Sequence, residues 1–166
     1  MKSIYFRNFL ATAFLVLSCF IIIGIAFFFL GRSYLINNTR DSMRASADEV
    51  VRAASALSRE QSLASWSLRM TISPVANSTS CHIFICDQDG LVLSCSDLVP
   101  YCGEHLGKQL DQTVVNTLHV EKGLDRMSTL AGFYHEQRLV VAKPIESDGG
   151  VIGYVFVSSD NAAILG

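Results

Sequence analysis

Charge is missing from one long stretch of this 166-residue chain. No Asp, Glu, Lys or Arg occurs between Phe9 and Leu30, and a helix of roughly 22 residues would extend over about 33 Å. Because the hydrocarbon core of a bilayer is about 30 Å thick, the run predicts a membrane span over residues 9–31. Residues 1–8 would then be cytoplasmic, and the function should lie in the part that follows.

A cleaved signal peptide is the main alternative for this run. Its apolar core usually spans about 7–15 residues and ends at a small-x-small site, which residues 31–33 match poorly. Residues 16–19 weakly resemble a lipoprotein box, but Leu17 stands where a small residue is expected and apolar residues continue after Cys19. The run therefore favours a retained anchor in the cell membrane.

Basic patches and metal-binding spacings are also missing. The chain has 13 Lys and Arg against 15 Asp and Glu, a net charge of −2, so nucleic acid is not an expected partner. No catalytic constellation or nucleophile elbow is present, and the histidines do not pair at metal-ligand spacing. They are His82, His105, His119 and His135. The sequence therefore predicts no cofactor, no metal and no enzymatic activity for this chain alone.

The cysteines are few, and all but Cys19 are clustered. The clustered ones are Cys81, Cys86, Cys95 and Cys102. An even, clustered set beyond a signal-like anchor favours disulfides in an oxidising compartment, and the spacing lacks the C-x-x-C pairs typical of zinc. Lys and Arg are too evenly divided across the span to decide its orientation, so the cysteines lead us to expect residues 32–166 outside the cytosol.

Strand geometry narrows the disulfide pairing without deciding it. Cys81 and Cys86 would lie about 16 Å apart on one strand, well beyond the roughly 7 Å that a bridge can span. We expect Cys81–Cys95 with Cys86–Cys102. The pairing Cys81–Cys102 with Cys86–Cys95 remains open.

A long helix is expected after the span, over residues 32–68. Its apolar residues recur at alternating steps of four and three, which is an a/d stripe. They are Met43, Ala47, Val50, Ala54 and Leu57. The stripe either packs on its own domain or pairs with a second copy, and we expect it to contribute to a homodimer.

The remaining sequence alternates between strand and helix patterns. Residues 73–80 have the composition of a loop. Strands at 82–86 and 91–95 flank a turn from Asp87 to Gly90, a helix follows over 104–121, and three strands occupy 126–134, 137–145 and 151–159. The order predicts an α+β domain in which helices cover one face of a five-stranded antiparallel sheet.

Three short motifs resemble extracytoplasmic PAS-like (Cache-type) sensor domains of bacterial membrane receptors. They are Asp87-x-x-Gly90-x-Val92, Leu106-Gly107-Lys108, and Pro144-Ile145 followed by residues 150–155. The likeness covers residues 33–160, and the version with Cys81 and Cys86 is most similar to Gram-positive two-component sensor histidine kinases. It implies a sensor domain at 69–160, with 161–166 starting the connection to a second span and a kinase core that this chain lacks.

Other receptor outputs fit the same resemblance. A chemoreceptor or a diguanylate cyclase would carry a similar sensor region. A pilin-like anchored subunit is a different alternative, but it would need a Gly-Phe processing site and an early helical Glu, which the chain lacks.

The resemblance also implies a cup for an unknown small molecule, with polar groups from the sheet or its rim. The candidates are Tyr134, Arg138, Lys143 and Arg126. A cation at the edge of an apolar cup can hold a carboxylate, and Arg does so bidentately. Positions 138 and 143 differ by an odd number, so a regular strand directs them to opposite faces. We therefore expect one of them at most in the site, and favour Arg138.

Overall fold

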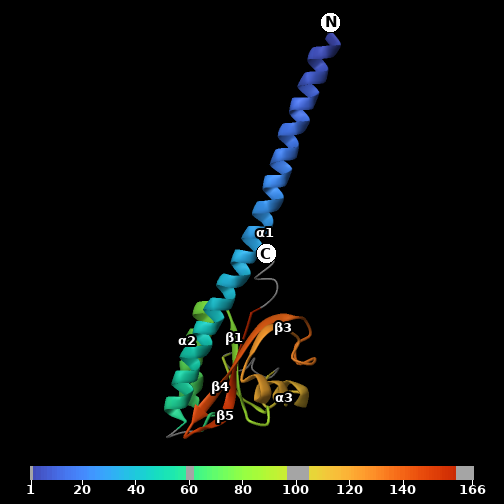
Figure 1. Ribbon diagram of the computed structural model, residues 1–166. Helices are drawn as coiled ribbons and strands as arrows, with labels where there is room; N and C mark the ends of the chain where they lie inside the picture. The colour runs from blue at the N-terminus through green and yellow to red at the C-terminus, as the bar shows by residue number, and fades with distance from the viewer. Residues whose placement is uncertain (1, 59–61, 97–104, 160–166) are drawn as a thin grey trace. The chain divides into compact units, whose positions relative to one another are not determined.

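The computed structural model describes residues 2–58, 62–96 and 105–159 (Figure 1). It divides into two compact units, Met1–Asn38 and Thr39–Gly166. Helix α1 (Lys2–Leu57) begins in the first unit and ends in the second. Cys102 and residues 161–166, which entered the sequence-based expectations, lie outside the described residues.

The first unit is a helical segment whose apolar side chains are exposed. Its most apolar 18-residue window has a mean hydropathy of 2.9 and is 0% buried. Thr12 and Ser18 donate their hydroxyls to the carbonyls of Asn8 and Leu15, at 2.9 and 2.8 Å, so these polar groups are satisfied within the helix. By length and composition this helix can cross a membrane, and an N-terminal signal sequence would have the same properties.

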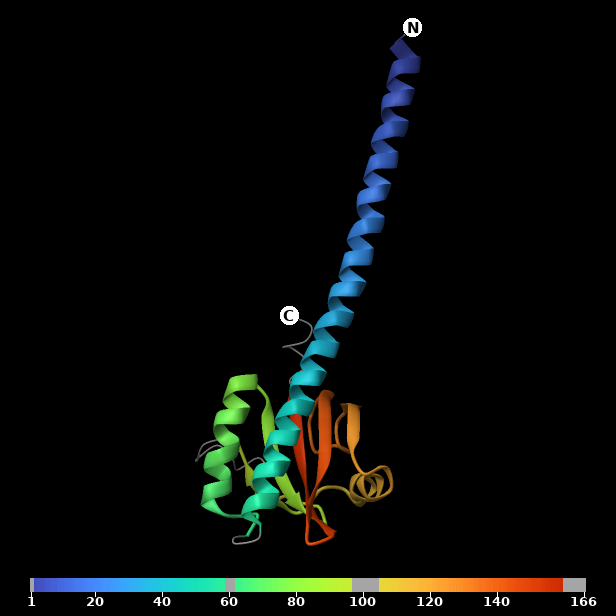
Figure 2. The same cartoon turned by 60° about the vertical axis from the view of Figure 1, so that its left-hand side comes forward.

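The second unit contains the five-stranded antiparallel sheet that the sequence predicts (Figure 2). Its order is β2-β1-β5-β4-β3. The strands are β1 (His82–Asp87), β2 (Val92–Cys95), β3 (Leu124–Ser128), β4 (Arg138–Ser147) and β5 (Gly150–Ser159). The α+β fold class is therefore confirmed. The expectation that helices cover one face is wrong in this detail: helices lie over both faces of the sheet, with α1 and α2 (Trp66–Thr79) on one and α3 (Gln112–Glu121) on the other.

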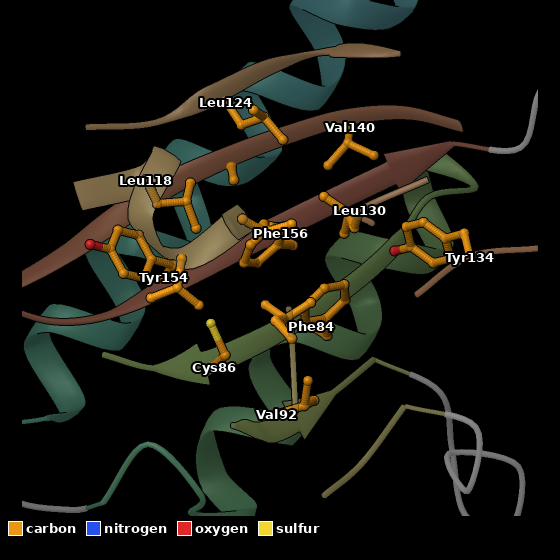
Figure 3. Close-up of a cluster of buried hydrophobic side chains, with 14 of the residues drawn as sticks. Phe84, Cys86, Val92, Leu118, Leu124, Leu130, Tyr134, Val140, Tyr154 and Phe156 are labelled. Carbon is orange, nitrogen blue, oxygen red and sulfur yellow. The ribbon is translucent and has the colours of Figure 1, made fainter. Parts of the chain in front are cut away.

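Strand alternation divides the core into two layers. Ala142 pairs with Phe156 on β4 and β5, and both belong to the apolar cluster under α3 (Figure 3). The next pair, Val141 with Val157, is as deeply buried but must project to the other face, toward α1 and α2. Both faces of the central strands are therefore covered.

The α1 stripe packs within its own chain. Met43, Ala47, Val50 and Ala54 are each 0% exposed, while Leu57 is half-buried. Of the two alternatives for this stripe, the structure shows the intramolecular one. Four fully buried side chains offer no surface to a second copy, so the homodimer seam that we expected along this stripe is not available in this conformation.

Ion pairs flank that stripe. Asp125 on β3 forms an ion pair with Arg40 of α1, whose Nε lies 2.9 Å from Oδ1, and accepts a hydrogen bond at Oδ2 from Arg44 Nε at 2.6 Å. Lys143 on β4 pairs with Asp48. These contacts join α1 to two neighbouring strands at the edge of the sheet.

Helix α2 corrects two expectations, since the long helix was predicted to reach residue 68 and residues 73–80 to form a loop. α1 ends at Leu57 and a separate helix starts at Trp66, where Ser65 caps it by accepting from the Leu68 amide. Pro74 lies inside this helix on its exposed side. Burial of Leu68, Ile72 and Ala76 at four-residue steps outweighs the one hydrogen bond that the proline removes.

Helix α3 is shorter than predicted, as is β3. Asp111 caps α3 by accepting from the Thr113 amide at 2.8 Å, and Gly107, at φ +75, lies in the turn that precedes it. The strand expected over 126–134 ends at Ser128, because Leu130, Ala131 and Gly132 all have positive φ. Tyr134 therefore lies in a loop, although it is buried.

The β1–β2 turn confirms the predicted hairpin. Asp87 accepts hydrogen bonds from the amides of Asp89 and Leu91, at 3.0 and 2.8 Å. Gly90 has φ +89, and a Cβ there would meet the side chain of Val115 on α3. The glycine is required both by the turn and by the close approach of the helix.

Gly153 gives a direct test of strand packing. A Cβ at this position of β5 would clash with the backbone carbonyl of Cys86 on β1, which has no freedom to move away. We expect Gly153→Ala to lower the free energy of unfolding by about 1–3 kcal/mol, measured by denaturant titration. Gly150→Ala is the matched control, since nothing lies within 4 Å of its Cβ position. Equal stability of the two variants would contradict the described pairing of β1 with β5.

Candidate functional site

The candidate site lies at one end of the α3 face of the sheet, where β4 begins. Tyr134 is 4% exposed, and its hydroxyl lies 2.8 Å from Ser158 Oγ on β5. The Arg138 guanidinium carbon lies 4.8 Å from the centroid of the Tyr134 ring. The hydroxyl contact fixes the ring in place, and the ring in turn orients Arg138 by a cation–π contact.

Aromatic rings fill the space beside this pair. Phe84 and Phe156 stack with centroids 4.6 Å apart, and Phe133 lies 5.3 Å from Phe84. His105 contacts both Phe133 and Tyr134, at 5.3 and 5.9 Å. Figure 3 shows Phe84, Phe156 and Tyr134 together in this part of the apolar cluster. The rings thus form a packed aromatic wall beside Tyr134 and Arg138.

The structure separates the two cations that the parity argument compared. Arg138 is on the α3 face with Tyr134, whereas Lys143 pairs with Asp48 of α1 on the other face. The expected division of these positions between opposite faces is therefore observed, and Lys143 lies away from the candidate site.

Arg126 lies on the same face as Arg138. Arg126 pairs with Val140, whose side chain is in the α3-face cluster. Ser128, two residues farther along β3, pairs with Arg138. Diagonal neighbours of this kind have Cα atoms about 7–8 Å apart, within reach of long side chains. The edge of the sheet thus carries two guanidinium groups on one face.

Sequence reasoning missed three members of this region. His105 and Phe133 provide rings, and Ser158 provides the hydroxyl partner of Tyr134. The pattern of β5 could have indicated Ser158, since it has the same parity as Phe156. His105 and Phe133 come from loops, whose path no periodicity predicts.

The predicted disulfides are not formed. Cys81 and Cys86 are buried free thiols, so neither pairing that we considered exists here. The register explains this for Cys81: Cys95 lies opposite Phe84, so Cys81 is three residues, or about 10 Å, farther along and has the opposite parity. The Cys81 thiol instead donates to the carbonyl of Thr79 at 3.4 Å. The expected placement of residues 32–166 outside the cytosol therefore has no support from disulfide bonds.

Cys86 is the most deeply placed thiol among the described cysteines. It is 0% exposed, and Figure 3 shows it beside Tyr154. Burial raises the pKa of the Cys86 thiol from about 9 to about 12, although a hydrogen bond with the backbone of Tyr154 partly opposes the shift. A thiol held protonated in this way is a packing group and not a nucleophile.

Two solved sensor domains share this architecture. The first is the sensor domain of the V. cholerae histidine kinase DctB, with TM-score 0.50 and 14% identity, covering 80% of this chain and 53% of that one. The chain thus spans about half the length of the DctB structure. The second is the E. coli DcuS sensor domain, with TM-score 0.50 and 16% identity, covering 77% of this chain and 96% of that one.

The fold is that of a PAS-like sensor domain. The resemblance stated from the sequence motifs is therefore confirmed at the level of structure. No protein-family model matches the sequence, and no curated protein matches it. In this chain the candidate residues Tyr134, Arg138 and Arg126 lie on the α3 face of that fold.

The raised pKa of Cys86 predicts a specific pH dependence of stability. Above about pH 9 the unfolded thiol loses its proton, whereas the folded thiol keeps it until about pH 12, so rising pH favours unfolding in this window. We expect the free energy of unfolding to fall more steeply over this range in the parent than in Cys86→Ala. Near-ultraviolet circular dichroism of the aromatic cluster would report unfolding.

Cys19→Ala is the matched control for that experiment, because Cys19 is exposed in the first unit. It should keep the parent's slope. A Cys86→Ala variant with the same slope as the parent would refute a strongly shifted Cys86.

Proposed function

We propose that this chain is the extracytoplasmic sensor region of a membrane receptor, the N-terminal part of a two-component histidine kinase. A helix able to cross a membrane precedes a PAS-like domain, and the similar V. cholerae domain belongs to a histidine kinase. Helix α1 continues without a break from the apolar run into the domain, as a helix that carries a signal would. A chemoreceptor or diguanylate cyclase output would use the same sensor region.

The ligand we propose is a small organic anion at the rim that Tyr134, Arg138 and Arg126 form. One observation carries this assignment: the half-buried Arg138 guanidinium is oriented by the Tyr134 ring at the edge of an aromatic wall. Arg binds carboxylates bidentately, and a guanidinium fixed in plane loses less entropy when it does so. Arg126, diagonal to it on β3, supplies a second positive charge on the same face.

Other basic side chains near this edge of the sheet are already paired with carboxylates, so they would bind such an anion weakly. Arg40, Arg44 and Lys143 are each paired with a carboxylate of the same chain. Arg126 makes no ion pair with another described residue.

A thermal-shift screen of the full chain in detergent tests this proposal. We expect at least one small mono- or dicarboxylate to raise the melting temperature, because it binds the folded state alone. Arg138→Gln should abolish that shift, and Arg126→Gln should reduce it. Titration calorimetry with the same carboxylate would give the loss of affinity, expected at about tenfold or more for Arg138→Gln.

Arg52→Gln is the matched control, since Arg52 is exposed on α1. It should respond like the parent. A carboxylate shift that survives in both Arg138→Gln and Arg126→Gln would reject the rim as the site, while the sensor fold would stand.

The proposed topology has its own test. Alkaline phosphatase, which is active only outside the cytosol, should be active when joined after Gly166 and inactive when joined before Met1. The unfused chain should stay with membranes after carbonate washing, because residues 9–30 form a retained anchor. The opposite activity pattern would reverse the orientation, and a soluble chain lacking those residues would identify them as a signal peptide.

A further inference from the structure

A cavity lies at the other end of the α3 face, between the last turn of α3 and the β4–β5 hairpin. Its volume is about 270 Å³. Leu118 and Val151 give it apolar walls, and its polar lining includes His119, Lys122, Glu146 and Tyr154. Glu146 lies eight residues along β4 from Arg138, or about 26 Å, so this cavity is separate from the rim at Arg138.

A buried hydroxyl organises one wall of this cavity. Tyr154 is 1% exposed, and its hydroxyl lies 3.0 Å from Nδ1 of His119. Figure 3 shows the Tyr154 oxygen at the edge of the apolar cluster, directed away from Phe156. When Tyr154 donates to Nδ1, the neutral imidazole carries its proton on Nε2, which is then a hydrogen-bond donor.

The cavity lining carries two side chains of opposite charge, Lys122 and Glu146. Lys122 ends α3 in a left-handed conformation, and Glu146 is near the end of β4. Neither side chain makes an ion pair or hydrogen bond with another residue in the described part of the chain. The helix thus contributes a cation and the hairpin an anion to one concave surface.

We propose that this cavity binds a small zwitterion of the α-amino-acid type. Lys122 and the Nε2 proton of His119 receive the carboxylate, and Glu146 receives the ammonium group. Leu118 and Val151 contact the aliphatic side chain of the ligand. The cavity is smaller than the roughly 300–1,000 Å³ of sites for drug-sized ligands, which suits a metabolite of amino-acid size.

Ligand analogues that lack one charge test this pairing directly. The full chain in detergent would be titrated with L-leucine and the other standard α-amino acids. N-acetyl-L-leucine, which has no ammonium group, and leucinol, which has no carboxylate, are the decoys. We expect a free amino acid to shift the His119 ring signals in an NMR spectrum and to raise the melting temperature, and both decoys to bind at least about tenfold more weakly.

Two isosteric variants locate the site. Lys122→Met and Glu146→Gln should each weaken binding about tenfold or more, whereas Lys108→Met and Glu121→Gln, which alter exposed charges outside the cavity, should not. Circular dichroism of each variant confirms that it is folded. Arg138→Gln should leave amino-acid binding intact, which separates this result from the test of the anion rim.

Three outcomes would overturn the proposal. In the first, no standard amino acid binds. In the second, the decoys bind as well as the free amino acid. In the third, binding survives in both Lys122→Met and Glu146→Gln but is lost in Arg138→Gln, which would place the ligand at the rim instead.

Discussion

Burial of both faces of the central strands is the constraint on which the rest of this domain depends. Every residue of β5 from Gly153 to Ser159 is buried, and β4 is buried from Leu139 to Ala142. Because adjacent residues project to opposite faces, each position is committed either to α1 and α2 or to α3. Consecutive residues therefore serve different layers: Asp125 holds α1, while Arg126 lies on the face of the candidate site.

The docking of α1 follows from the same constraint. Its buried stripe consists of Met43, Ala47, Val50 and Ala54, each 0% exposed. Apolar burial supplies most of the energy at roughly 25 cal/mol per Å², whereas partly exposed ion pairs are worth about 0–1 kcal/mol each. The pairs of Asp125 and Lys143 thus select the position of α1 along the sheet more than they stabilise it.

The sequence allowed the sheet to be predicted well, because alternation and turn chemistry are local signals. The three later strands and the opposite faces of Arg138 and Lys143 follow from the two-residue period of strands. The Asp87–Gly90 turn follows from its turn residues. Helix α2 could not be foreseen in this way, since its proline argues against a helix and only tertiary burial of Leu68 and Ile72 overrides it. The first-choice disulfide failed on register, because Cys95 pairs with Phe84 and so lies three residues away from Cys81, on the other face.

The candidate sites depend on loops to a greater degree, and this limited their prediction. Tyr134 follows the positive-φ residues 130–132 and His105 precedes Gly107, so neither position could be assigned to a face from periodicity. Each end of the aromatic cluster is nevertheless marked by a buried tyrosine whose hydroxyl has a partner. Tyr134 contacts Ser158 at one end and Tyr154 contacts His119 at the other.

This arrangement explains where a ligand can bind on the α3 face. Rings 4.6 to 5.9 Å apart leave no room for a small molecule between them, so the middle of the face is closed by its own side chains. Polar contacts then lie at the two ends, where the Tyr134 hydroxyl meets Ser158 and the Tyr154 hydroxyl meets His119. Of the two ends, the one at Arg138 presents positive charge, and the one at Tyr154 presents Lys122 and Glu146 together. The same packed core that stabilises the domain therefore separates the proposed anion rim from the proposed zwitterion cavity.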